Sequence, residues 1–301
     1  MKSAPFAYAR PGSVDDVLDE LGREGAKVIA GGQSLVPVLA MRLARPTVLV
    51  DINAVEELST LSAESDGLRV GATVRQRAVQ RDVKAERVPL LGMALPWVGH
   101  RELRSRGTVC GSLAHADPAA ELPAVACCLG ATITVAGAGG ERNVPASEFF
   151  VAAMTTAIQP EELVTSVHFP FATRGQGFAF AEIARRLGDF ALAGVAVMVD
   201  GSAPLHPVAR VVCFGVSDKP VVRDVSAWLE SAIALDGEVT TETVIRESLS
   251  MGSADFAAGV VDTVGDTSGS TPYRRRLIST LVSRELARGY VRSTQSELGT
   301  L

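Results

Sequence analysis

The hydrophobic pattern of residues 1–55 predicts a strand–helix–strand–helix–strand unit. FAYA and KVIA have the length and composition of short strands, and TVLVDI closes the unit as a third. Ser13 and Asp16 form a capping box before the first helix, whose apolar face is marked by Val14, Val17, Leu18 and Leu21. A second helix is expected over Leu35–Leu43. This order favours a βαβ unit with a glycine turn between the second strand and the second helix.

Beyond residue 55 the pattern indicates two further parts. Over 56–175, LRVGATV and ELVTSVHFPF are typical of strands, VPLLGMALPWVG of a helix, and ATITVAGAGGERNVP of a hairpin. Over 176–290, GFAFAEIA, FALAGVAVMVD and VARVVCFGV are spaced as strands of an antiparallel sheet. Helices are expected after them at Val225–Ala234, Thr240–Ser250 and Tyr273–Tyr290, followed by a frayed polar tail at 291–301. The sequence therefore predicts an α+β chain in three parts.

Composition and charge narrow the class of protein. The 301 residues are 47% hydrophobic and 21% charged, which is typical of a globular protein. A net charge of −5 argues against nucleic acid as a partner, and the basic run Arg274–Arg276 is predicted to be a solvated face. MKSAPFAYARPG lacks the apolar core of a signal peptide, and Phe190–Val199 is too short to span a bilayer. We therefore expect a cytoplasmic protein with no transmembrane segment.

The cysteines and histidines predict neither a metal site nor a catalytic group on this chain. The cysteines are Cys110, Cys127, Cys128 and Cys213. They show no CxxC pair and no metal-ligand spacing, and the adjacent pair in PAVACCLGA is expected to be small buried hydrophobes. The histidines are His100, His115, His168 and His206. They form no ligand pair at helical spacing and no Ser/His/Asp arrangement.

Two glycine-bearing loops are the candidate ligand-binding segments. In VIAGGQSL, Gly31 and Gly32 follow a strand and precede a helix, so that bare backbone amides can face an anion such as a pyrophosphate. The alternative is an ordinary turn, and neither a P-loop nor a Rossmann GxGxxG is present. In RSRGTVCGSLAHADPAAELP, Thr108 and Ser112 offer hydroxyl donors, with Gly107 and Gly111 leaving the backbone bare around them.

The acidic end of the second loop carries two carboxylates. Asp117 is predicted to cap a helix that begins at Pro118, with ligand contact as a secondary role. Glu121 is an acceptor suited to ribose or adenine donors, and His115 lies close enough in sequence to touch the same ligand.

The two loops, in this order, resemble the flavoprotein (medium) subunit of molybdenum hydroxylases, the group of carbon monoxide dehydrogenase, xanthine dehydrogenase and bacterial N-heterocycle hydroxylases. The resemblance covers nearly the whole chain. It is carried by AGGQS at Ala30–Ser34, LRSRGTVCGS at Leu103–Ser112, HADPAAELP at His115–Pro123, HFP at His168–Pro170, RRLGDFA at Arg185–Ala191 and YRRRL at Tyr273–Leu277.

The resemblance implies a vanillyl-alcohol-oxidase (PCMH)-type fold with FAD extended between the lobes 1–55 and 56–175, and a third domain over 176–290 at the flavin end. Ala30–Ser34 would line the pyrophosphate from one side, and Thr108, Gly111 and Ser112 from the other. Arg185–Phe190 would lie beside the isoalloxazine. The positions expected to contact FAD are Val28, Ile29, Ala30, Gly31, Gly32, Gln33, Ser34, Leu35, Val98, Leu103, Thr108, Val109, Cys110, Gly111, Ser112, His115, Asp117, Glu121, Val164, Arg186, Asp189 and Phe190.

The second loop departs from the family at one position. The family shows TxGGS, whereas this chain has Thr-Val-Cys-Gly-Ser, so Cys110 replaces a glycine. A Cβ there costs about 1 kcal/mol or more if the site needs a positive φ. We expect the cysteine to be tolerated and FAD still to bind.

The resemblance implies an electron-transfer subunit. A large partner would hold molybdopterin and hydroxylate the substrate, a small partner would hold two [2Fe–2S] clusters, and the complex would be a dimer of heterotrimers. Two alternatives stay open: a stand-alone FAD oxidase or dehydrogenase of the same fold, and a non-catalytic nucleotide-binding scaffold. Gln33 favours a heterocycle hydroxylase over a carbon monoxide dehydrogenase, because relatives of the latter tend to have His in this loop. The final acceptor is open.

Overall fold

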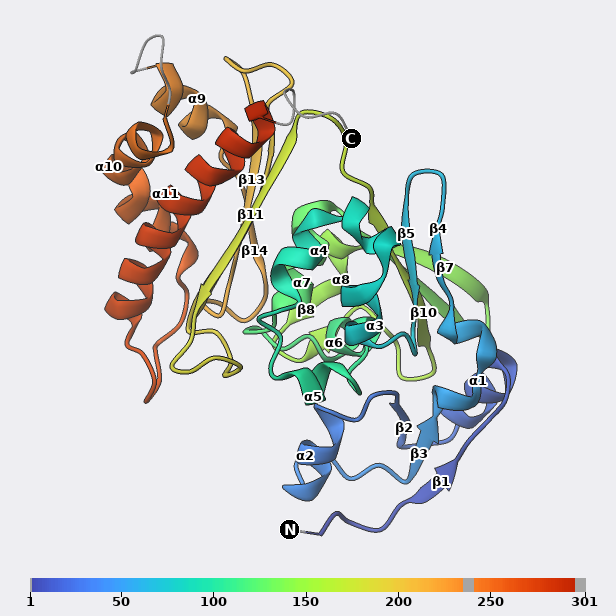
Figure 1. Ribbon diagram of the computed structural model, residues 1–301. Helices are drawn as coiled ribbons and strands as arrows, with labels where there is room; N and C mark the ends of the chain where they lie inside the picture. Colours follow the sequence, from blue (N-terminus) through green and yellow to red (C-terminus); the bar gives the residue numbers. More distant parts are fainter. Residues whose placement is uncertain (1, 235–240, 296–301) are drawn as a thin grey trace. The chain divides into compact units, whose positions relative to one another are not determined.

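The computed structural model describes residues 2–234 and 241–295, which form two compact units. As far as they are described, Met1–Glu86, His100–Ala116 and Gly130–Pro170 make the first unit, and Arg87–Gly99, Asp117–Leu129 and Phe171–Leu301 make the second. Both units combine helices with sheets, which confirms the predicted α+β class (Figure 1). The three-part division at residues 55, 175 and 290 stays a prediction.

The N-terminal sheet of the first unit is the predicted βαβ arrangement. Its strands are parallel in the order β1 (Ala7–Ala9), β3 (Val48–Asp51) and β2 (Ala26–Ile29). Ser13 caps α1 (Val14–Leu21) by accepting a hydrogen bond from the Asp16 amide at 3.2 Å, as the capping box predicts. The helix α2 (Leu35–Ala40) ends before the predicted Leu43, and Arg42 just beyond it has a φ of 59°. Two short 3-10 turns follow β3, at Ile52–Ala54 and Glu56–Ser59.

The second sheet of this unit is antiparallel throughout. Its order is β4 (Leu61–Ala63), β5 (Gly67–Gly71), β10 (Leu163–Pro170), β6 (Thr132–Gly137) and β7 (Gly140–Pro145). The predicted hairpin is β6–β7, and the strand predicted to stop at Pro170 is β10. The remaining elements of the unit are α3 (Gln76–Arg81), α5 (Arg101–Arg104), α6 (Val109–His115), α8 (Ala146–Phe149), β8 (Phe150–Ala152) and β9 (Thr155–Thr156). A further 3-10 turn spans Val83–Arg87.

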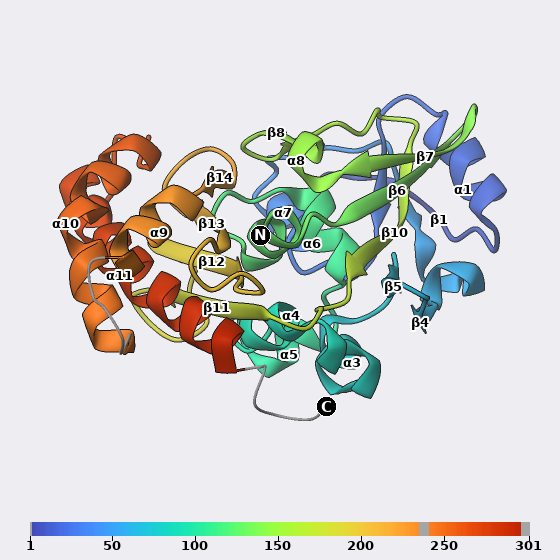
Figure 2. The same cartoon turned by 90° about the horizontal axis from the view of Figure 1, so that it is seen from above.

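The second unit is built on the predicted antiparallel sheet. Its order is β11 (Gln176–Ile183), β12 (Ala193–Asp200), β13 (Val208–Phe214) and β14 (Val221–Asp224). Figures 1 and 2 show one face of this sheet covered by α9 (Ser226–Ala234) and α11 (Thr271–Gln295), with α10 (Glu242–Val260) packed against these two helices. The other face meets α4 (Pro89–Ala94) and α7 (Glu121–Leu129). This sheet is therefore buried on both sides.

Alternation along the strands decides which side chains meet the three long helices. Every second residue of β12, from Ala193 to Val199, is fully buried in the helix-facing core. Alanines on β11 and the small or branched residues Ala209, Val211 and Cys213 on β13 complete that face, and leucines and isoleucines of α9, α10 and α11 fill it. The sequence patterns predicted these strands and the three helices that follow them. The helices extend beyond the prediction, since α10 continues to Val260 and α11 to Gln295, past the start of the expected tail. Residues 296–301 lie outside the described part.

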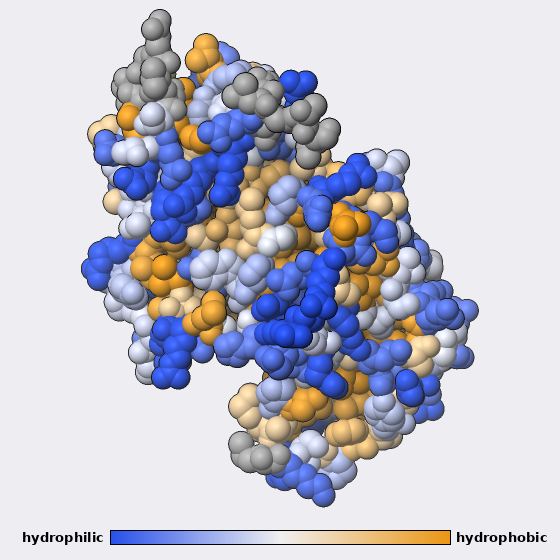
Figure 3. Space-filling model, in the orientation of Figure 1, coloured by the Kyte–Doolittle hydropathy of each residue, from blue (hydrophilic) through white to orange (hydrophobic). Residues whose placement is uncertain are grey.

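The outer surface carries mixed side chains. The face drawn in Figure 3 shows hydrophilic residues interspersed with hydrophobic patches. None of the described helices has both the length and the apolar character that crossing a bilayer requires.

Arg274 corrects the prediction that the basic run Arg274–Arg276 is a solvated face. Its side chain is only 6% exposed. The guanidinium donates to the carbonyl oxygens of Leu192 and Gly215, and its Nη2 lies 2.8 Å from a carboxylate oxygen of Asp266. A planar group with five donors can satisfy several carbonyls at once, which a run of charges in the sequence does not reveal. Arg274, the first arginine of the YRRRL motif, therefore stabilises the second unit by hydrogen bonding to its backbone.

We predict that Arg274→Leu destabilises the second unit by about 2–4 kcal/mol, because it leaves buried carbonyl groups without donors. The free energy of unfolding in urea measures this effect. The matched control is Arg275→Leu, at an exposed neighbouring position, which should change stability by less than about 0.5 kcal/mol. Equal stability of the two variants would contradict the role assigned to Arg274.

Candidate functional site

The first glycine loop lies between β2 and α2, as predicted. Gly32 has a φ of 71°, in the left-handed region that glycine adopts without strain. The Gln33 side chain folds back and donates from Nε2 to the Gly31 carbonyl at 3.2 Å. Ser34 is exposed and makes no side-chain capping bond to α2. The loop therefore presents backbone amides and a hydroxyl group at the carboxyl edge of the parallel sheet.

The second glycine loop leads directly into α6. Thr108 is the N-cap of this helix, and its Oγ1 accepts from the Gly111 amide at 3.0 Å. Its side chain is only 2% exposed, whereas Gly111 and Ser112 are partly exposed. The Thr108 hydroxyl hydrogen can still be donated, because the cap uses only an oxygen lone pair.

The two loops touch each other through their backbones. A Cβ placed on Gly31 would lie 2.3 Å from the Arg106 carbonyl oxygen and 2.8 Å from the Gly107 Cα. No side chain fits at such distances. The bare backbone at Gly31 is thus required for the approach of the loops themselves, and the structure brings together the two segments that the sequence singled out.

Two residues that the sequence reasoning missed bridge the loops. The Asn53 amide donates from Nδ2 to the Ala30 carbonyl at 2.9 Å. Arg75 donates from Nη2 to Asn53 Oδ1 and from Nη1 to the Arg106 carbonyl, each at 2.6 Å. Asn53 follows TVLVDI, and the carboxyl ends of neighbouring parallel strands meet at one edge. The position of Asn53 directly after a predicted strand could have indicated its role, whereas nothing near Arg75 in the sequence indicates that it bridges the loops.

The electrostatics of this bridge are set by partial burial. Burial and the neighbouring Arg106 lower the pKa of Arg75, while Asp51 raises it. Burial alone would raise the pKa of Asp51, but hydrogen bonds from the Tyr8 hydroxyl and from Asn53 outweigh it and lower that pKa. Arg75 donates to Asn53 Oδ1 and Asp51 accepts from Asn53 Nδ2, and these two hydrogen bonds fix the orientation of the Asn53 amide.

Gln76, which the sequence analysis did not identify, holds the second loop through two hydrogen bonds. Its backbone amide donates to the Gly107 carbonyl at 2.9 Å, and its side-chain Nε2 donates to the Thr108 carbonyl at 3.3 Å. Its Oε1 is buried and has no hydrogen-bond partner among the described residues. Such an acceptor is costly unless a ligand or water supplies a donor.

Cys110 does not disturb the second loop. It lies within α6, so its backbone is helical and needs no positive φ. Its Sγ donates to the Val70 carbonyl at 3.4 Å, and burial raises the pKa of the thiol to about 12. All four cysteines are buried, as expected for the pair Cys127–Cys128, and none carries the low pKa of a reactive thiol.

The predicted helix cap at Asp117 is wrong. The helix α7 begins at Glu121, and residues 118–119 form a turn instead. Asp117 Oδ1 accepts from the Ala119 amide at 2.8 Å within that turn. A Pro after an Asp starts turns as readily as helices, and the sequence alone does not separate the two. His115 is the last residue of α6.

The remaining predicted contact residues divide between the units. In the first unit, Val164 is 5% exposed on β10, and Val28, Ile29, Leu35, Leu103 and Val109 flank the glycine loops. The second unit carries Val98, Asp117, Glu121, Arg186, Asp189 and Phe190. The loop after β11 is open to solvent, with Phe190 69% exposed and Asp189 3.7 Å from Arg185. That exposure leaves an aromatic ring free to contact a ligand or a partner.

Two polar clusters lie away from the predicted site. Glu64, Asp66 and His168 bring their ligand atoms within 4.8 Å of one another and are the group able to hold a metal ion within the described ranges. His168 Nε2 is already 3.2 Å from Asp66 Oδ1, and both carboxylates are exposed, so a hydrogen bond accounts for the cluster.

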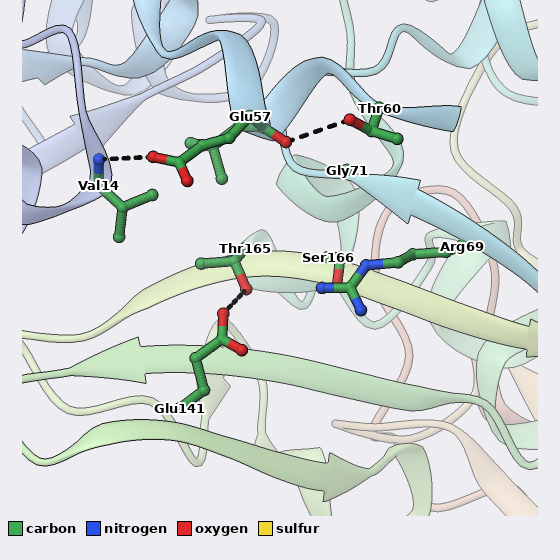
Figure 4. A pocket seen from close by; sticks show the side chains of 9 residues that line it. Val14, Glu57, Thr60, Arg69, Gly71, Glu141, Thr165 and Ser166 are labelled. Atoms are coloured by element: carbon green, nitrogen blue, oxygen red, sulfur yellow. Dashed lines mark hydrogen bonds between the residues drawn. The ribbon is translucent and has the colours of Figure 1, made fainter. Parts of the chain in front are cut away.

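A cavity of about 190 Å³ opens beside β5 and β10 (Figure 4). Glu57 accepts there from the Val14 amide at 3.0 Å, Glu141 lies 3.5 Å from Thr165 Oγ1, and Arg69 points into the same space. Because Glu57, Glu141 and Arg69 bring charges of both signs into this small cavity, it favours neither an anionic nor a cationic ligand. It contains none of the residues predicted to bind a cofactor.

The fold and the two glycine loops occur in a chain that matches a family of FAD-binding proteins. Residues 4–172 match the family described as FAD binding domain in molybdopterin dehydrogenase. The chain is similar to the 6-hydroxypseudooxynicotine dehydrogenase complex subunit alpha of Paenarthrobacter nicotinovorans, with 36% identity over 97% of each chain. It is similar to the caffeine dehydrogenase subunit beta of Pseudomonas sp. (strain CBB1), with 33% identity over 96% of each chain. Quinoline 2-oxidoreductase from Pseudomonas putida 86 matches its fold with a TM-score of 0.86 and 31% identity, over 97% of this chain and 99% of that chain.

The chain therefore belongs to the family of FAD-binding domains in molybdopterin dehydrogenases. The resemblance drawn from the two loops is confirmed, as are FAD as the cofactor of this chain and its class, an oxidoreductase subunit. The residues present fit the cofactor, because Ser34 on the first loop is exposed and Gly111 and Ser112 on the second loop are partly exposed, which leaves hydroxyl groups and bare backbone for an anion.

We predict that Gly31→Ala weakens FAD binding by about 10- to 100-fold. The added Cβ would overlap the Arg106 carbonyl, and relieving such an overlap costs about 1–3 kcal/mol. The measurement is a titration of the apoprotein with FAD. Gly139→Ala in the β6–β7 hairpin is the matched control, since a Cβ there meets nothing within 4 Å. Native affinity in both variants would show that the loop contact is irrelevant to FAD.

Proposed function

We propose that this chain is the FAD-binding electron-transfer subunit of a heteromeric molybdenum hydroxylase. Electrons would arrive from [2Fe–2S] clusters on a partner chain, pass through FAD and leave to an external acceptor. The observation that carries the proposal is the contact between the two glycine loops, in a chain similar over nearly its whole length to two dehydrogenase subunits.

The side chains around the loops support a role in holding FAD rather than in acid–base chemistry. Gln33, Ser34 and Thr108 are neutral at every working pH. Amides of Ala30–Ser34 would bind the diphosphate from one side, with hydroxyls of Thr108 and Ser112 donating from the other. Asn53 and Arg75 would keep the loops at a fixed separation. When bound, FAD supplies the redox chemistry, exchanging electrons one or two at a time.

The cysteines support a partner for the iron–sulfur clusters. All four are buried with pKa values raised to about 12, and their spacing matches no cluster motif. The complex would contain a molybdopterin large subunit and a [2Fe–2S] small subunit, arranged as a cytoplasmic dimer of heterotrimers. Gln33 and the substrates named for the relatives, 6-hydroxypseudooxynicotine, caffeine and quinoline, favour an N-heterocycle as the substrate of the large subunit.

The proposal is tested by following flavin absorbance in the isolated chain and in the assembled complex. We expect the isolated chain to hold FAD but to leave it oxidised when quinoline is added anaerobically. The complex, co-purified from its native host, should carry two further chains and reduce the flavin when its heterocyclic substrate is added. Reduction in the isolated chain would support a stand-alone dehydrogenase, and a colourless chain that binds no added FAD would support a scaffold; either result contradicts the proposal.

A further inference from the structure

The cavity beside β5 and β10 contains a buried hydroxyl group that the proposed FAD site does not use. All the residues that line this cavity belong to the first unit. Ser166 is only 2% exposed, and its Oγ has no hydrogen-bond partner among the residues that the structure describes. A hydroxyl group in such a position is costly unless a ligand or a water molecule supplies its partner. The Ser166 hydroxyl therefore points to a polar occupant of the cavity.

Hydrogen bonds fix a second wall of the cavity, formed by residues 57–60. The Gly71 amide donates to the Thr60 carbonyl at 2.9 Å, and the Thr73 amide donates to the Leu58 carbonyl at 3.0 Å. A Cβ on Gly71 would lie 2.3 Å from the Leu58 carbonyl oxygen, so the bare backbone of this glycine allows the wall to approach β5. A site whose walls are already in place loses little conformational freedom when it binds a ligand.

Arg69 brings a positive charge to the face of the sheet that carries Ser166. Ser166 pairs with Gly71, and Arg69 lies two residues before Gly71 on β5, so the two side chains point to the same face. Figure 4 shows the Arg69 guanidinium pointing into the cavity. Its Nη1 lies 4.0 Å from a Glu64 carboxylate oxygen, which is too far for a hydrogen bond. The planar donors of a guanidinium match a carboxylate, and the Ser166 hydroxyl adds a further donor.

Two carboxylates bring negative charge to the cavity from different elements. Figure 4 shows Glu57 on the wall formed by residues 57–60 and Glu141 on the side of β7. Glu57 Oε1 accepts from the Val14 amide at 3.0 Å, and Glu141 Oε1 lies 3.5 Å from the Thr165 hydroxyl oxygen. A carboxylate accepts several hydrogen bonds, so both groups can still receive the N–H donors of an ammonium group.

The volume and the charges of the cavity together limit its ligand. The volume is about 190 Å³. A cavity of about 150 Å³ holds a benzene-sized molecule, so this one admits a ligand of roughly six to eight heavy atoms. An anion of that size would be repelled by Glu57 and Glu141, and a cation would be repelled by Arg69. A ligand that carries both charges pairs with both sets of side chains.

We propose that this cavity binds a small zwitterion of the α-amino acid class. The carboxylate of the ligand accepts hydrogen bonds from Arg69 and from the Ser166 hydroxyl, and its ammonium group donates to Glu57 and Glu141. The site contains no residue of the glycine loops and needs neither FAD nor a partner chain. The inference therefore goes beyond the proposed function and does not depend on it.

Calorimetric titration of the full chain at neutral pH tests the class of ligand. The probes are L-alanine, propionate, which lacks the ammonium group, and ethylamine, which lacks the carboxylate. We expect saturable binding of L-alanine at millimolar concentrations. Either analogue should bind at least about tenfold more weakly, because it leaves one set of charged side chains unpaired. An analogue that binds as tightly as L-alanine would overturn the zwitterion, and an absence of saturable L-alanine binding would overturn the site itself.

Variants test whether L-alanine binds in this cavity. Arg69→Met should weaken its binding at least about tenfold, and Ser166→Ala about three- to tenfold, because each removes a donor to the carboxylate of the ligand. The controls Arg81→Met and Glu148→Gln change exposed residues of the same unit outside the cavity and should bind as the native chain does. Unfolding in urea checks that each variant is folded. Native L-alanine affinity in Arg69→Met would overturn the proposal, and if that variant does not fold, native affinity in Ser166→Ala would do so.

Discussion

The contact between the Gly31 backbone and the Arg106–Gly107 backbone is the constraint on which the rest of the site depends. Atoms this close leave no room for a side chain, so the two loops can meet only where one of them is bare. Asn53 and Arg75 hold the contact with hydrogen bonds of 2.6–2.9 Å to carbonyls on both sides. The parallel sheet supplies one loop and the cap of α6 supplies the other. An FAD diphosphate gripped by both would join segments that are about seventy-five residues apart.

Much of this could be read from the sequence, because it depends on local chemistry. The capping box at Ser13, the hairpin turn in β6–β7 and the alternation along β12 each appear as a pattern within a few residues. The glycine loops were visible for the same reason. The resemblance then supplied the cofactor, which no pattern of hydrophobic residues could have named.

What the sequence could not supply depends on contacts between distant residues. Arg75 looks like any partly exposed arginine, and its role exists only because Asn53 and the Arg106 carbonyl lie beside it. Arg274 was predicted to be solvated, yet its fork of donors meets carbonyls about 60 and 80 residues away. The prediction that Asp117 caps a helix was wrong for a different reason, since a helix cap and a turn share the same local sequence pattern.

The Asn53–Arg75 bridge holds the two glycine loops in contact with each other, and the proposed FAD site depends on that contact. The most direct measurement is the dissociation constant for FAD of Arg75→Met beside that of Arg81→Met. Arg81 is an exposed arginine at the end of α3, the helix for which Arg75 is the N-cap residue. Losing two charge-assisted hydrogen bonds of about 1.5–3 kcal/mol should weaken FAD binding by at least about tenfold, while Arg81→Met binds as the native chain does. Native affinity in Arg75→Met, with the fold intact, would contradict the claim.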